Sequence, residues 1–80
     1  MLIDYIRAAM HHARYELLDD DEGFYGEIAP CPGVFANADT LEGCRDQLAE
    51  VLEDWILVRV AQGLELPVID EQHIRIADIA

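Results

Sequence analysis

Residues 23–42, which read GFYGEIAPCPGVFANADTLE, constrain the fold of this chain more than any other segment. A β-rich run enters a loop that contains Pro30 and Pro32, and proline ends a strand because it has no N–H to donate to the ladder. Gly33 can then release the chain with a positive φ into a second short apolar run. A polar pair and a long helical pattern follow. The segment predicts a compact β-loop-β-α unit without an evident catalytic group.

Apolar residues at three- and four-residue spacing predict two helices. The first apolar stripe consists of Leu2, Ile3, Ile6, Ala9, Met10 and Ala13. The second pattern begins at Leu41 and ends near Gln62. Asp39 or Thr40 is expected to cap the start of this helix, and Gly63 its end.

Strand patterns predict an antiparallel sheet. Residues 13–18 alternate, the acidic run of residues 19–22 before Gly23 favours a tight turn, and residues 24–29 resume as the second strand of a hairpin. Residues 34–38 form a third strand, and residues 69–80 suggest a last one. The predicted fold is α+β, in the order α-β-β-β-α-β, with the long helix covering one face of the sheet. We expect one domain over residues 1–80.

The charge of the chain limits its partners. Seventeen acidic residues against five arginines and no lysine give a formal net charge of -12. Phosphate backbones require clustered cations, so direct binding of nucleic acid is not expected. An acidic surface favours solubility and fast encounter with a basic partner, including a protein that itself binds nucleic acid.

The small size of the chain favours self-association. A domain of 80 residues buries only about 60 to 65% of the surface of its unfolded chain, so we expect a homodimer. No apolar run approaches the roughly 18 residues of a membrane span. The first residues place Asp4 and Arg7 within an apolar stretch and lack a basic leader. We therefore expect a cytoplasmic protein.

Missing residue types exclude several enzyme classes. The chain has no serine and no lysine, which excludes Ser-His-Asp hydrolysis, Schiff-base chemistry and the GxxxxGK[ST] phosphate loop. The acidic run could hold a divalent cation, but its spacing is not that of an EF-hand, so a solvated turn is favoured. His11 and His12 are adjacent and do not share a helix face, which disfavours zinc. We expect no enzyme activity, no metal and no cofactor.

Four further residues have a structural and a functional interpretation. Cys44 is in register with the apolar seam of the second helix, so a buried thiol is favoured. Cys31, held between prolines, is expected to be the more exposed cysteine, although no motif supports a nucleophile. Trp55 suits an interface anchor but is aligned with the core seam. Tyr25 alternates with Phe24, so one of the two aromatic rings faces an uncovered side of the sheet, our candidate dimer or partner surface.

These residues resemble a known family. The spacing is similar to the pattern G-x-Y-x-A-x-x-P-x-x-P-G followed by G-D-T-x-E-E-A of HicB-like antitoxins from bacterial type II toxin-antitoxin systems. The matching residues are Gly23-Phe24-Tyr25-Gly26-Glu27-Ile28, then Pro30-x-Pro32-Gly33, then Ala38-Asp39-Thr40-Leu41-Glu42. The resemblance extends over roughly residues 13–70.

The resemblance implies a degenerate ribonuclease-H-like fold and a specific partner. That partner is a HicA-like toxin, a small basic ribonuclease of double-stranded-RNA-binding shape, whose cleavage of messenger RNA is blocked in the complex. Acidic side chains of this chain would then meet the RNA-binding surface of the toxin. We assign partner contact to Asp19, Asp20, Asp21, Glu22, Tyr25 and Glu27.

Three departures from the family pattern alter these expectations. The loop reads Pro30-Cys31-Pro32, so either it is one residue shorter than usual or Ala29 stands where the family has its first proline. Gly43 and Cys44 replace a Glu-Ala pair. We expect no DNA-binding domain after residue 80, and therefore no direct repression of an operon. Two alternatives remain: a small dimeric regulatory module without a toxin, and a metal-dependent nuclease of ribonuclease-H type. The nuclease is disfavoured because the carboxylates are not expected to converge.

Overall fold

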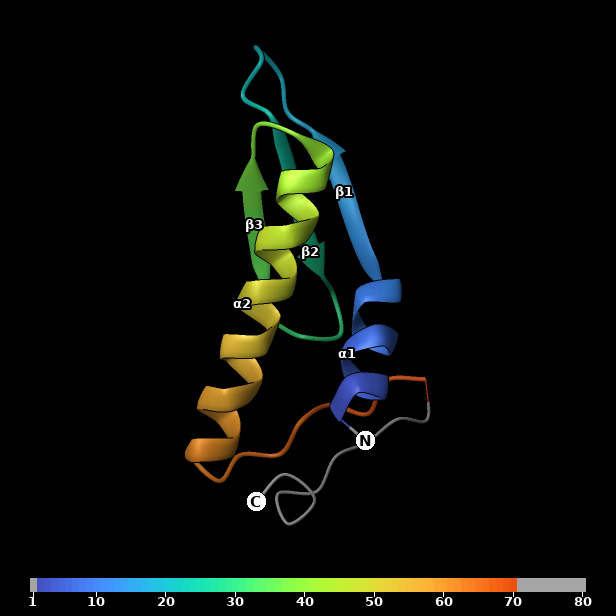
Figure 1. The fold of residues 1–80 in the computed structure, drawn as a ribbon, viewed down its shortest axis with the longest axis vertical. Coiled ribbons are helices and arrows are strands. Elements are labelled where there is room, and N and C mark those ends of the chain that lie inside the picture. Colours follow the sequence, from blue (N-terminus) through green and yellow to red (C-terminus); the bar gives the residue numbers. More distant parts are fainter. Residues whose placement is uncertain (1, 71–80) are drawn as a thin grey trace.

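The computed structural model describes residues 2–70. Its elements are α1 (Leu2–His11), β1 (Ala13–Leu17), β2 (Phe24–Ile28), β3 (Phe35–Ala38) and α2 (Leu41–Ala61). The three strands form an antiparallel sheet in the order β1-β2-β3 (Figure 1). The α+β fold and its first five elements are thereby confirmed, with strand ends shifted by one residue. The predicted last strand lies mostly outside the described residues.

The α2 helix packs along one face of the sheet, and its C-terminal half continues past the strands to the level of α1 (Figure 1). The core lies between these layers and includes Ile28, Val34, Leu48 and Leu52, each at most 2% exposed. Gly26 faces the helix, because a Cβ there would lie 3.1 Å from the sulfur of Cys44. A glycine at the centre of β2 therefore allows α2 to approach the sheet closely.

The predicted core face of α1 was partly wrong. Ile3 is 55% exposed, whereas Tyr5, which was not in the predicted stripe, is fully buried. The Tyr5 hydroxyl donates a hydrogen bond of 2.6 Å to the carbonyl oxygen of Pro67. This bond satisfies the one polar atom of the side chain, so the ring can be buried like that of a phenylalanine. Burial raises the pKa of Tyr5 well above its usual range.

The predicted exposure of Cys31 was also wrong. Its side chain is fully buried beside Tyr5, because the loop after β2 folds inward. The amide of Cys31 donates to the carbonyl of Ile28 at 3.0 Å, and Val34 donates to the carbonyl of Cys31 at 3.1 Å. Burial raises the pKa of the Cys31 thiol and, on α2, that of the Cys44 thiol. Cys44 is buried as expected.

Both ends of α2 are capped by local hydrogen bonds. Of the two predicted caps, Thr40 is the one used: its Oγ1 accepts from the amide of Gly43 at 2.9 Å. At the other end Gly63 has a φ of 72°, its amide donates to Val60, and the amide of Leu64 donates to Arg59. These are the two bonds of a Schellman motif, which confirms the predicted glycine stop.

The Thr40→Ala variant is expected to lose about 1 kcal/mol of unfolding free energy, because an amide at the start of α2 loses its acceptor. Asp39→Ala is the control, since the side chain of Asp39 does not accept the capping bond. Urea unfolding followed by circular dichroism measures both variants. An equal or larger loss in Asp39→Ala would contradict the assignment of the cap.

Candidate partner-binding surface

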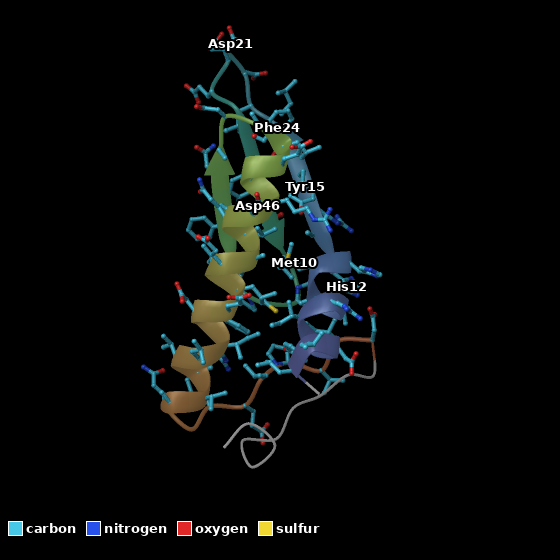
Figure 2. All side chains as sticks on the ribbon, in the orientation of Figure 1. Met10, His12, Tyr15, Asp21, Phe24 and Asp46 are labelled. Atoms are coloured by element: carbon cyan, nitrogen blue, oxygen red, sulfur yellow. The ribbon has the colours of Figure 1, made fainter. Side chains whose placement is uncertain are left out.

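The acidic turn, residues 19–22, forms the tip of the β1-β2 hairpin at one end of the molecule (Figure 2, labelled Asp21). Asp20 and Asp21 have φ values of 58° and 57°, which are the signs that a type I′ turn requires at its two central positions. The amide of Glu22 donates to the carbonyl of Asp19 at 3.3 Å, and that of Leu18 to Gly23 at 2.8 Å. All four acidic side chains are exposed. The predicted tight turn is confirmed.

The strand register defines a second surface beside the turn, the outer sheet face, which is opposite α2. Ile28 and Gly26 of β2 face the helix, so Tyr25 and Glu27 face outward. Their partners on the neighbouring strands then face outward too. The outer sheet face consists of Arg14, Glu16, Tyr25, Glu27, Phe35 and Asn37. No other element within residues 2–70 covers it.

Two aromatic rings lie at the centre of the outer sheet face. The rings of Tyr25 and Phe35 are stacked, with centroids 6.3 Å apart, and Phe35 is 57% exposed. The Tyr25 hydroxyl donates to a carboxylate oxygen of Glu27 at 3.3 Å. Loss of solvation, followed by the negative charges of Glu27 and Glu16, raises the pKa of Tyr25. The surface thus combines an exposed apolar centre with carboxylates, as protein-binding surfaces do.

The structure brings the predicted partner-binding residues into two adjoining groups. Asp19, Asp20, Asp21 and Glu22 form the acidic turn, while Tyr25 and Glu27 lie on the outer sheet face. Phe24 points to the core side, as the alternation predicted. Sequence reasoning missed Phe35 and Glu16, which the hairpin register places beside Glu27 and Tyr25. Contact of the six predicted residues with a partner stays a prediction.

The remaining candidates are arranged as structural groups. The Nε2 atom of His12 lies 2.8 Å from a carboxylate oxygen of Asp70, an exposed pair that links the end of α1 to the segment after α2. Trp55 is half-buried against the core, and the guanidinium carbon of Arg59 lies 4.9 Å from its ring centroid. Within residues 2–70, no three His, Cys, Asp or Glu side chains are grouped as metal ligands would be. In the same range, no helix has the length and apolar character needed to cross a membrane.

Comparisons with known proteins agree with this architecture. The model of the UPF0150-like family matches residues 4–67. Among solved structures, the chain is similar to the crystal structure of TTHA0281 from Thermus thermophilus, with 42% sequence identity and a TM-score of 0.87. The similarity covers 92% of this chain and 91% of TTHA0281. No curated protein matches the sequence.

Proposed function

Because this chain belongs to the UPF0150-like family, we propose that it is a HicB-like antitoxin, or a stand-alone relative of one, that binds a small basic HicA-like toxin. The segment that resembles HicB-like antitoxins, residues 23–42, lies within the part matched by the family. In this proposal the protein is cytoplasmic and inhibits by stoichiometric contact. It supplies no catalytic group of its own.

The observation that carries the proposal is the acidic turn next to the outer sheet face. Four consecutive carboxylates extend from the end of the hairpin, and Glu16 and Glu27 continue the negative charge beside Tyr25 and Phe35. A surface that binds RNA presents clustered cations to phosphates. Carboxylates on a projecting turn can meet the same cations, while the aromatic pair supplies apolar contact. Occupation of that surface would keep messenger RNA away from the toxin.

Co-expression tests the proposal directly. The chain is produced together with any short basic protein that an adjacent reading frame encodes. The two are co-purified, and cleavage of messenger RNA is assayed with and without the chain. We expect a stable complex and loss of cleavage at equimolar ratio. No complex, or cleavage that continues within a complex, would refute the antitoxin. Magnesium- or manganese-dependent cleavage by the purified chain alone would establish the nuclease instead.

Neutralising the acidic turn is expected to weaken toxin binding about 30-fold. The variant carries Asp19→Asn, Asp20→Asn, Asp21→Asn and Glu22→Gln. An exposed ion pair contributes about 0.5 kcal/mol, so four lost pairs amount to roughly 2 kcal/mol. Asparagine tolerates positive φ well, so the turn at Asp20 and Asp21 is preserved. Calorimetric titration against the toxin at constant salt measures the change.

A matched control removes the same charge from the exposed side of α2. It carries Glu42→Gln, Asp46→Asn, Glu50→Gln and Asp54→Asn, all at exposed positions. Because both variants lose four negative charges, non-specific attraction falls equally in both. We expect a change below about threefold in the control. A larger loss in the control than in the turn variant would move the binding surface to α2.

A further inference from the structure

The last two turns of α2, residues 55–61, carry apolar side chains on most sides, and Arg59 is their one charged residue. Ile56 is buried, but its neighbours Leu57 and Val58 are 57% and 53% exposed, and Leu64 after the helix is 43% exposed. A helix with apolar residues all round is normally covered on both sides. Here the described chain covers one side, which leaves Leu57, Val58 and Leu64 as an apolar surface on the other.

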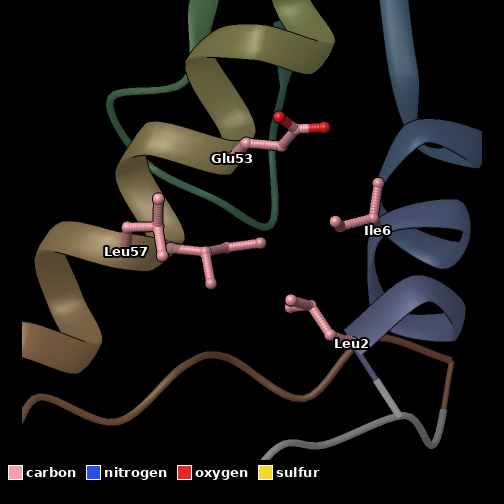
Figure 3. Close-up of a pocket in the computed structure, with 5 residues that line it drawn as sticks. Leu2, Ile6, Glu53 and Leu57 are labelled. Atoms are coloured by element: carbon pink, nitrogen blue, oxygen red, sulfur yellow. The ribbon is translucent and has the colours of Figure 1, made fainter. Parts of the chain in front are cut away.

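A shallow hollow adjoins this surface between α1 and α2 (Figure 3). Its volume is about 210 Å³, and apolar side chains form most of its lining. The lining residues are Leu2, Ile6, Glu53, Ile56 and Leu57. In the close-up, Leu2 and Ile6 point from α1 toward α2, with Glu53 and Leu57 opposite them. The hollow can accept an aliphatic side chain from outside.

The charge pattern indicates what covers this surface. Residues 55–64 contain no aspartate or glutamate, although the chain carries seventeen acidic residues and a net charge of -12. The one charged side chain in this stretch, Arg59, stacks on Trp55 and donates two hydrogen bonds, of 2.7 and 3.1 Å, to the carbonyl of Glu65. Two acidic copies repel each other where carboxylates face carboxylates. Glu53 is the one carboxylate that lines the hollow, and residues 55–64 add none, so two copies can approach here with little repulsion.

We propose that this surface is the interface of a symmetric homodimer. The C-terminal halves of the two α2 helices pack across a two-fold axis, and Leu57 of each copy inserts into the hollow of the other. An isologous contact uses the same surface of both copies, so each chain must carry both the inserted side chain and the hollow that receives it. This chain carries both, as Leu57 and the hollow between α1 and α2. The acidic turn lies at the opposite end of the molecule (Figure 1) and stays exposed. The inference does not depend on a toxin.

Solution mass with a matched pair of variants tests the interface. Leu57 and Phe35 are each 57% exposed, on α2 and on the outer sheet face respectively. At micromolar concentration, light scattering should give wild type twice the chain mass of 9.0 kDa. Leu57→Glu should give the chain mass, while Leu57→Met and Phe35→Glu should remain dimeric. Circular dichroism checks that each variant is folded.

Several outcomes would overturn the interface. The wild type could be monomeric while Leu57→Glu unfolds at a lower temperature than wild type. That result would mean that residues 71–80 of the same chain cover the surface. A monomeric wild type that binds a basic partner less tightly in Leu57→Glu would assign the patch to that partner. If Phe35→Glu dissociates the dimer and Leu57→Glu does not, the copies meet through the outer sheet face.

Salt provides an independent readout. Added NaCl screens the repulsion between two chains of net charge -12. The dissociation constant of the dimer should therefore fall as NaCl rises from about 0.05 to 0.5 M, over which the screening length shortens several-fold. A dissociation constant that rises with salt would mean that ion pairs hold the copies together, contrary to a contact made by apolar side chains. Both measurements use the protein alone, so they can fail while toxin binding succeeds.

Discussion

Replacing Gly23 with alanine is expected to remove about 3 kcal/mol of unfolding free energy, one of the two largest losses expected for any single substitution proposed for this chain. Gly23 follows the acidic turn with a φ of 90°, where an L side chain is strained. An added Cβ would press against the carbonyl oxygen of Ala38 and lie 3.0 Å from its carbonyl carbon. Both atoms belong to backbone, so relief would require β2 and β3 to move apart.

Gly63→Ala is the matched control for Gly23→Ala. Gly63 also has a positive φ, 72°, but no heavy atom lies within 4 Å of an added Cβ. Only the conformational cost remains there, about 1 kcal/mol. Urea unfolding of both variants can be followed by the fluorescence of Trp55, the one tryptophan. Equal losses of unfolding free energy in the two variants would show that the contact with Ala38 adds nothing to the cost of Gly23→Ala.

The second large effect is expected from Leu48→Ala, with a loss of about 3 kcal/mol. Leu48 is fully buried where α2 packs on the sheet. Removing its branched end leaves a cavity that the short strands can fill only by moving. In a domain of this size the loss should lower the unfolding temperature by roughly 15 °C.

A leucine on the same helix controls for the change of residue type. Leu41 is 47% exposed at the start of α2. Leu41→Ala removes the same atoms without a buried cavity, so a loss below about 1 kcal/mol is expected. Differential scanning calorimetry of both variants decides the matter. If Leu48→Ala unfolds at the same temperature as wild type, the packing of Leu48 between α2 and the sheet does not stabilise the fold.

Sequence patterns predicted the elements where local chemistry decides them. Thr40, Gly63 and the acidic turn each form short-range hydrogen bonds or adopt backbone angles that their own side chains favour, so the boundaries of α2 and of the hairpin were predictable. The apolar spacing of α2 also predicted the burial of Cys44, because the period of a helix places Cys44 on the same face as its buried leucines.

Positions set by distant contacts were not predictable. Burial of Tyr5 depends on the carbonyl of Pro67, which is 62 residues away, and Cys31 is buried only because its loop folds toward α1. The outer sheet face required the register between three strands, which joins Phe35 to Glu27 and Tyr25. No pattern within a single strand contains that register.

The two buried thiols have an experimental consequence. Cys31 and Cys44 are the only cysteines, both are fully buried, and burial raises the pKa of each thiol. A thiolate must be formed and reached before an alkylating reagent can react. Alkylation of the native protein therefore requires the core to open, and the rate of alkylation depends on how often it opens. Mass spectrometry of the alkylated protein would therefore report how often the core opens at two separate places: the loop after β2, which holds Cys31, and the first turn of α2, which holds Cys44.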